Sequence, residues 1–270
     1  MKSFSAISGP AHRLAPAARG LFASCFILLM VHALVPDAGR ASPSIKPSEI
    51  PGVLTQKGKN LTALKAVMSV NSSYDDGKSR QDIKGFLLYR RPDDFRFQGV
   101  GPGGNSLFEL IIKAARFELY IPAESKIIKG AKHCFGKRFP DVAEIEGLIP
   151  LILFQWKNVV FDKLISSKDG EITIRFKFEG RLWGATLDPD KLVLKRLVRL
   201  GDDGRIDLTA DFGDFASGDY GWLPRRFEVR SPAARWRTVV RITNFETNPF
   251  LLEKNFMLEP AFSPTVEKCQ

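Results

Sequence analysis

The sequence predicts a mainly β fold with a few helices, in which one antiparallel sheet curls towards a barrel and helices cover one side. Three observations support this prediction. About eleven short segments alternate apolar and polar residues, as strands with one buried face do. One central stretch, residues 141–157, has apolar residues at helical spacing instead. No repeat of the length found in solenoids or propellers is visible in the sequence.

The N-terminal segment, residues 1–41, has the pattern of a secretory signal peptide. Basic residues precede an apolar run from Leu21 to Val35, and small residues follow it. The run has about 15 residues, fewer than the roughly 20 that span a bilayer. We therefore expect cleavage after Ala41 and export. Two alternatives stay open, an uncleaved anchor and a lipid attached to Cys25, although the apolar run continues past that cysteine.

The charge balance restricts the possible partners. The chain has 270 residues, with 40 Lys and Arg against 30 Asp and Glu. Cleavage would remove four basic residues and one acidic residue, which leaves a net charge of +7. A basic balance suits nucleic acid, an anionic membrane surface or solubility alone. For an exported protein we expect no nucleic acid, and an anionic membrane surface stays open.

The mature chain is expected to form one domain between two extensions. Residues 42–58 contain three prolines and predict a tether that leads into a short helix. Residues 59–247 contain the predicted strands and form the main domain. The tail, residues 248–270, contains three more prolines and is expected to wrap the outside of that domain.

The clearest strands lie within residues 85–122. Phe95 and Phe97 alternate with polar residues, and after a Gly/Pro-rich turn Phe117 and Leu119 do the same. Antiparallel sheets can leave one face in water while the other face packs against a core. The apolar face of this sheet therefore needs a cover or a ligand.

The same alternation continues in the second half of the chain, where Ile174, Phe176 and Phe178 share one face of a predicted strand. The pairs Asp76-Gly77 and Asp203-Gly204 are typical of hairpin turns. The expected strands lie at about 79–90, 94–99, 106–112, 115–121, 125–129, 171–179, 181–187, 191–200, 205–212, 224–230 and 235–246.

The helical stretch at residues 141–157 is expected to be amphipathic and interrupted at Pro150. It can cover the apolar face of the sheet in two ways. It can close an ordinary core, or it can close a cavity for acyl chains, where each buried methylene contributes about 0.8 kcal/mol. Its apolar residues include Ile145, Ile149, Ile152, Leu153 and Trp156.

Signals for catalysis or for a metal are weak. Only His133 remains after residues 1–41 are removed, and no Cys/His cluster has zinc spacing. The glycines of Gly99-x-Gly101-x-x-Gly104 fit a dinucleotide motif, but they follow a half-polar strand, and Pro102 removes a backbone donor. We therefore expect no catalytic residue, no metal and no cofactor.

Cys134 and Cys269 are the two cysteines of the mature chain. In an oxidising compartment they could form a disulfide. Two free thiols are an equally open interpretation, because the sequence does not show whether the two residues meet.

The central part of the chain, about residues 60–130, resembles the bacterial lipoprotein-localisation carriers LolA and LolB and the wider group of LolA/LolB-like envelope proteins. The motifs that carry the resemblance are Gly85-x4-Arg90-Arg91-Pro92-x-x-Phe95-Arg96-Phe97, Gly101-Pro102, Leu107-Phe108, Phe117-x-Leu119-Tyr120-x-Pro122 and Lys126-x3-Gly130.

This resemblance implies an incomplete, or half, β-barrel with a helical lid over an apolar cavity that receives acyl chains. Arg91 occupies the position of an arginine that ties barrel to lid in LolA. LolB is itself a lipoprotein, whereas this sequence lacks a convincing lipobox. With the lid formed by the helical stretch, the cavity residues predicted from the strands are Phe95, Phe97, Phe108, Phe117, Leu119, Ile174, Phe176 and Phe178.

The function predicted on these grounds is that of a monomeric, non-enzymatic carrier of lipid acyl chains or lipoproteins. Its expected location is the periplasm or the periplasmic face of the outer membrane. One alternative is a structural or interaction module of the envelope with a filled barrel. Another is an envelope lipid hydrolase, which would need His133 as its base.

Overall fold

A computed structural model describes residues 46–270 of the chain, except 169, 189, 219, 261–262 and 270. The predicted signal peptide, the site at Cys25 and the first part of the predicted tether lie outside the described residues.

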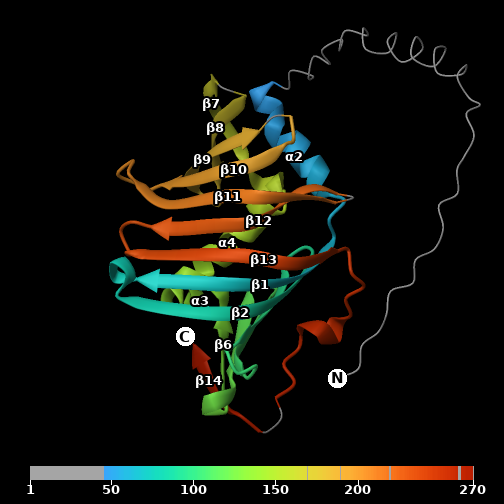
Figure 1. Ribbon diagram of the computed structural model, residues 1–270, viewed down its shortest axis with the longest axis vertical. Helices are drawn as coiled ribbons and strands as arrows, with labels where there is room; N and C mark the ends of the chain where they lie inside the picture. The colour runs from blue at the N-terminus through green and yellow to red at the C-terminus, as the bar shows by residue number, and fades with distance from the viewer. Residues whose placement is uncertain (1–45, 169, 189, 219, 261–262, 270) are drawn as a thin grey trace, which may run out of the picture. The chain divides into compact units, whose positions relative to one another are not determined.

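The described residues form one large curved sheet that stays open at both edges, which confirms the predicted mainly β, half-barrel fold. From edge to edge the strand order is β14-β6-β5-β4-β3-β2-β1-β13-β12-β11-β10-β9-β8-β7. Figure 1 shows this stack from β7 at the top to β14 at the bottom. Neighbouring strands are antiparallel, apart from β14 and β6, which run parallel.

The strands divide into two series that meet in the middle of the sheet, where β1 pairs with β13. Their bounds are β1 Ala63–Tyr74, β2 Ser79–Arg90, β3 Asp94–Val100, β4 Ser106–Lys113, β5 Arg116–Ile121, β6 Lys126–Ala131, β7 Val160–Lys168, β8 Glu171–Phe178, β9 Arg181–Asp188, β10 Val193–Leu200, β11 Ile206–Gly218, β12 Gly221–Ser231, β13 Trp236–Thr247 and β14 Thr265–Cys269.

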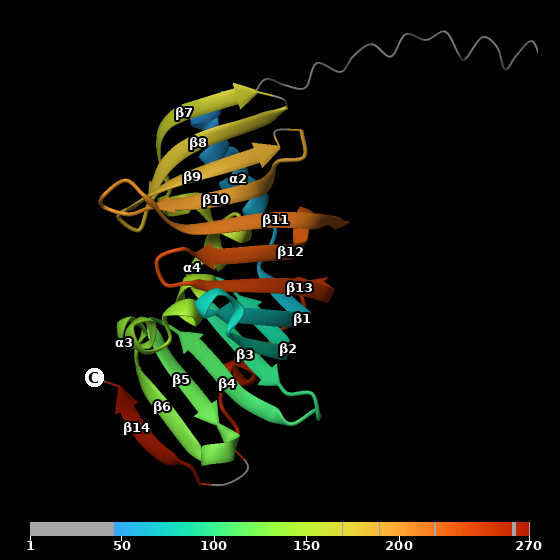
Figure 2. The same cartoon turned by 60° about the vertical axis from the view of Figure 1, so that its left-hand side comes forward.

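Three α-helices lie on the inner side of the curved sheet (Figures 1 and 2). They are α2 Ile50–Gly58, α3 Lys132–Arg138 and α4 Pro140–Ile152. The apolar sides of α2 and α4 join the core of the sheet, with Leu54, Leu148 and Leu151 almost fully buried. Short 3-10 turns connect other elements, namely η2 Pro47–Glu49, η3 Asp75–Gly77, η4 Pro122–Glu124, η5 Trp156–Asn158 and η6 Glu253–Phe256.

The period-two pattern predicts the buried faces well. In β8, Ile174 and Phe176 are fully buried, while the alternating residues Thr173 and Arg175 are only partly covered. In β5, Phe117 and Leu119 are buried in the same way. Turns are also present at Gly77 and Gly204, as predicted. Both glycines have a positive φ that other residues adopt only with strain.

The described chain has fourteen strands, where the sequence predicts about eleven. The segment that forms β1 is not among the eleven strands predicted above, yet hydrogen bonding to strands on both sides makes it central to the sheet. The segments that form β7 and β14 were not predicted as strands. Both are edge strands, and an edge strand needs no clean alternation because it is covered less completely.

The predicted helix at residues 141–157 is shorter than expected and is not interrupted at Pro150. α4 includes Pro150 in its last turn and ends at Ile152, and the chain then turns into η5. A proline this close to a helix end leaves few later turns to disrupt, because its missing N–H affects only one bond. The predicted interruption at Pro150 is therefore wrong, although the predicted helix is present.

Candidate functional site

An apolar cavity of about 180 Å³ lies between α4 and the inner face of the sheet. From α4 and the residue after it, the lining is Val142, Ile145, Ile149, Ile152 and Leu153. From the strands, the apolar lining is Leu64, Met68, Val70, Ile83, Leu87, Phe95, Phe97, Phe108, Leu223, Phe227, Val240 and Ile242. Tyr74 and Pro224 also line it, and Ser72, Gln81 and Glu146 add polar atoms to the lining.

Two glycines make room for the aromatic rings of this lining. The rings of Phe97 and Phe108 lie 5.7 Å apart between their centroids. A Cβ on Gly85 would collide with the Phe97 ring, and one on Gly99 would collide with the Phe108 ring. Because these positions carry no side chain, both rings can lie close against the sheet and leave space beneath α4.

We expect Gly85→Ala and Gly99→Ala to push these rings towards α4 and to lower the free energy of unfolding by about 1–3 kcal/mol, the usual effect of overpacking. Gly213→Ala is the matched control, because a Cβ there has open space in strand β11. Urea unfolding measures the difference. Equal stability of all three variants would contradict this account of the rings.

The predicted cavity residues fall into two groups. Phe95, Phe97 and Phe108 line the cavity. The other five residues pack in the core away from this lining, namely Phe117, Leu119, Ile174, Phe176 and Phe178.

The predicted lid residues divide in the same way. Ile145, Ile149, Ile152 and Leu153 line the cavity. Trp156 instead is buried to 1% exposure against the ring of Phe176, with 4.9 Å between ring centroids. The sequence pattern marks a side chain as inward-facing, but it does not separate a cavity wall from the core.

Sequence reasoning missed the wall that β1, β12 and β13 contribute. Met68 and Val70 alternate along β1, and Val240 and Ile242 alternate along β13. The alternation was therefore present in the sequence. What it could not indicate is that β1 and β13, from opposite ends of the chain, lie next to each other.

Arg91 ties the β2–β3 turn to the end of α2. Its Nη2 donates to the carbonyl oxygen of Gly58 at 2.5 Å, and its backbone N–H donates to the carbonyl oxygen of Thr62 at 2.9 Å. The resemblance implied a tie to the helical lid, whereas these contacts reach α2 and the residues that follow it. Next to this turn, Tyr89 accepts a hydrogen bond from Gln155, which lies just beyond α4.

Two ion pairs hold the N-terminal half of α4. Glu146 pairs with Lys132, the first residue of α3, at 2.8 Å. Glu144 pairs with Arg199 of β10, whose Nη2 lies 2.9 Å from Glu144 Oε1. Burial raises the pKa of the Glu146 carboxyl above its usual 4.5, and Lys132 partly opposes that shift.

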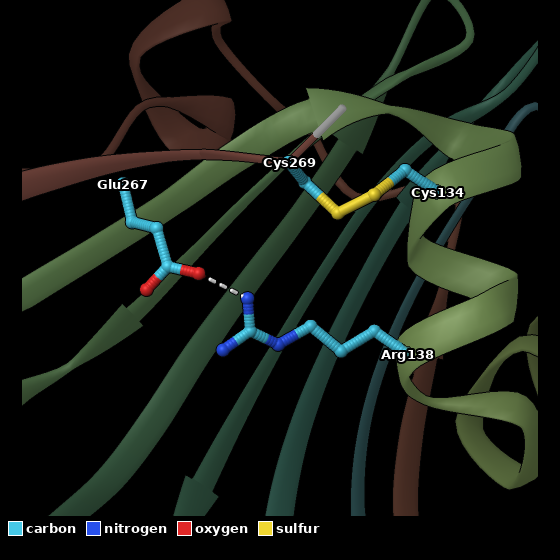
Figure 3. Close-up of a disulfide and its surroundings, with 4 residues drawn as sticks. All are labelled: Cys134, Arg138, Glu267 and Cys269. Atoms are coloured by element: carbon cyan, nitrogen blue, oxygen red, sulfur yellow. Dashed lines mark hydrogen bonds and ion pairs between the residues drawn. A yellow bond between two sulfur atoms is a disulfide. The ribbon is translucent and has the colours of Figure 1, made fainter.

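Cys134 and Cys269 form a disulfide, which decides between the two interpretations left open by the sequence. Figure 3 shows that it joins α3 to β14 beside a second contact, the ion pair of Arg138 with Glu267. Lys126 of β6 also pairs with Glu267, at 2.5 Å. The C-terminal strand is therefore held to α3 and to β6 by covalent and ionic contacts.

Hydrogen bonds from Lys126 and Arg138 lower the pKa of Glu267 from 4.5 to about 2. A carboxyl whose pKa falls on folding stabilises the fold above its ordinary pKa, and that contribution is lost as the pH drops through the folded value. We therefore expect wild type to be more stable than Glu267→Gln at pH 7, and this difference to vanish between about pH 4.5 and 2. Urea unfolding at several pH values measures it. A difference that stays constant down to pH 2 would contradict the role of Glu267.

Three further observations on the described part of the chain concern metals, membrane spans and the cysteine next to His133. No group of three or more His, Cys, Asp or Glu side chains is placed to hold a metal ion there. None of the helices described is long and apolar enough to cross a membrane. Cys134 is bound in the disulfide, so it offers His133 no free thiol as a nucleophile.

No protein-family model matches the chain, and no curated protein matches it by sequence. Solved structures match it by fold. A putative outer membrane lipoprotein-sorting protein domain from Vibrio parahaemolyticus gives a TM-score of 0.57 at 13% identity, with 77% of this chain and 94% of that chain covered. A LolA superfamily protein from Nitrosomonas europaea gives 0.56 at 12% identity, with coverage of 77% and 97%.

A DUF1329 family protein from Desulfovibrio piger gives a TM-score of 0.59 at 14% identity, with coverage of 79% and 98%. Identity this low shows a shared fold and nothing further. In fold class, the protein is an open half-barrel with helices on its inner side. More particularly, it has the LolA-like fold, as the resemblance implied.

Proposed function

We propose that the protein is a non-enzymatic, monomeric carrier that holds the acyl chains of lipids or lipoproteins in the cavity beneath α4. The observation that carries this proposal is the mainly apolar lining of that cavity, in which Ser72, Gln81 and Glu146 are the few polar side chains. Each methylene buried there would contribute about 0.8 kcal/mol. An acyl chain therefore gains affinity in proportion to the length that enters.

The size of the cavity has a consequence for loading. Its volume of about 180 Å³ is below the roughly 300–1,000 Å³ of ordinary ligand pockets. For a whole acyl chain to enter the cavity, part of α4 therefore has to move. The N-terminal half of α4 is the suitable part, because Val142 and Ile145 are only half-buried there, whereas Leu148 and Leu151 fix the C-terminal half in the core.

A location in the periplasm, or at the periplasmic face of the outer membrane, fits two observations. The disulfide is of a kind that persists in oxidising compartments. The first 41 residues have the sequence of an export signal. In this proposal, residues 59–247 form the carrier domain, residues 42–58 precede it as tether and helix, and residues 248–270 form its tail.

Native mass spectrometry of the protein purified from the envelope of an expressing bacterium tests the proposal. We expect lipid adducts on the wild type and their loss in Ile149→Trp, whose larger side chain would fill the cavity. Ile165→Trp is the matched control, because Ile165 lies on β7 with 52% of its surface exposed. Circular dichroism checks that both variants fold.

Two results would favour a different function. A wild-type protein without lipid adducts that also binds no fluorescent fatty acid would indicate an interaction module with a filled barrel. Lipid that is cleaved on incubation, with cleavage lost in His133→Ala, would indicate a hydrolase.

A further inference from the structure

A second cavity, of about 640 Å³, lies on the other side of α4, between α3, α4 and strands β8 to β10. We call it the α3–α4 groove. Unlike the apolar cavity, it is lined by charged side chains. The basic ones are Lys132, His133, Lys137, Arg181 and Arg199, and the acidic ones are Glu144, Glu146 and Glu179.

The acidic side chains of the groove are largely engaged by cations of the groove itself. Glu146 binds Lys132, and Glu144 binds Arg199. Glu179, at the exposed β8–β9 turn, makes no ion pair with a described residue.

Three basic groups of the groove stay available to a ligand. Arg181 lies 3.9 Å from Glu144, at the limit of an ion pair and with more than half of its side chain exposed. Lys137 and His133 are exposed and make no ion pair with any residue that the structure describes. With Glu179 as the opposing carboxylate, the available charge in the groove is positive, which favours an anion.

A buried hydrogen-bond donor without an acceptor also indicates that the groove binds an anion. The indole N–H of Trp183, a residue that lines the groove, has no hydrogen-bond partner among the described residues. Trp183 is only 5% exposed, and the guanidinium of Arg199 lies 5.7 Å from its ring centroid. Buried donors are nearly always satisfied, so an unpaired one indicates an acceptor that the protein alone does not supply.

The groove and the apolar cavity meet at one residue of α4. Glu146 lines both, with its carboxylate buried between them and held by Lys132. An amphiphile whose chains enter the cavity under α4 could therefore place its polar end in the groove by passing Glu146. A phosphate or carboxylate there would compete with Glu146 for Lys132 and would accept from Arg181 and Lys137.

We propose that the α3–α4 groove binds the anionic head group, a phosphate or a carboxylate, of a lipid whose acyl chains occupy the apolar cavity. This inference rests on the proposed carrier function and specifies its ligand class as anionic lipid. The same ligand would loosen the N-terminal half of α4, because it would replace one of the two ion pairs that hold it, the pair of Glu146 with Lys132.

The test compares two lipids with equal, fluorescently labelled chains, phosphatidylglycerol and diacylglycerol, on the delipidated full-length protein. We expect the wild type to bind phosphatidylglycerol about tenfold more tightly, the effect of one or two charge-assisted hydrogen bonds. The double variant Lys137→Gln, Arg181→Gln should lose this preference and keep its affinity for diacylglycerol. Trp183→Phe should reduce the preference without changing the affinity for diacylglycerol.

The control variant, Lys163→Gln with Arg205→Gln, removes the same charge from exposed positions on β7 and in the β10–β11 turn, and should keep the full preference. Inorganic phosphate should compete with phosphatidylglycerol and leave diacylglycerol bound. Equal binding of both lipids by the wild type would overturn the head-group site and leave the carrier function intact. Tight binding of free phosphate, with no tighter binding of phosphatidylglycerol than of diacylglycerol, would also overturn the head-group site and leave the carrier function intact. Binding of neither lipid would instead contradict the carrier function itself.

Discussion

Trp156→Ala is expected to lower the free energy of unfolding by about 3–5 kcal/mol, the range for removing a large buried aromatic side chain. Trp156 is 1% exposed, and its ring packs against Phe176 with 4.9 Å between centroids. Its indole N–H also donates to the carbonyl oxygen of Leu151 at 3.0 Å, so the side chain fixes the end of α4. Urea unfolding followed by circular dichroism measures the change.

Ile149→Ala is the informative comparison. Ile149 lies one turn before the end of α4, but it is half-buried and borders a space that already exists. We expect it to cost less than about 2 kcal/mol, the low end for Ile→Ala, and to affect lipid binding more than stability. The reverse order of the two stability losses would contradict the division of these residues into cavity wall and core.

Replacing both Cys134 and Cys269 by serine is expected to lower the free energy of unfolding by about 2–4 kcal/mol, and by up to about 5 kcal/mol if chain entropy alone applies. The large value follows from the length of the closed loop, because the two cysteines are 135 residues apart in sequence. Without this link the unfolded chain gains many conformations.

A reducing agent provides the control for this prediction. It should bring the wild type to the stability of the double serine variant and leave that variant unchanged. Equal stability of wild type and variant under oxidising conditions would show that β14 is held by its strand pairing and ion pairs alone.

The sequence predicts the strands that have one buried face and one exposed face, because the alternation of apolar and polar residues then follows their burial. Phe117 and Leu119 alternate with polar neighbours because one face of β5 is buried, and the pattern reports this directly. The segment Val160–Lys168 has no such pattern, because an edge strand is only partly covered. Its strand structure follows from pairing with β8, which is a property of the tertiary fold.

The candidate site was predictable to a smaller extent. The apolar faces of α4 and β3 were identified, since amphipathicity is a local property. That Phe97 borders a cavity while Phe176 is core depends on which strand lies opposite, and on glycines such as Gly85 that leave room for a ring. The α3–α4 groove collects charges from α3, β9 and β10, which nothing in their sequence spacing connects.

The pairing of β1 with β13 also bears on how the chain folds. Strands β1 to β6 and β7 to β13 each pair with their neighbours in sequence, so each series can form from local contacts. The two series join at β1 and β13, where Ala63 and Asn248 bond across a separation of 185 residues. Closing so long a loop costs entropy before it gains contacts, and non-local strand pairing slows folding for that reason. The cavity spans this seam, with Met68 on one side and Val240 on the other. We therefore expect the cavity to be completed only when β1 and β13 pair, after both halves of the sheet exist.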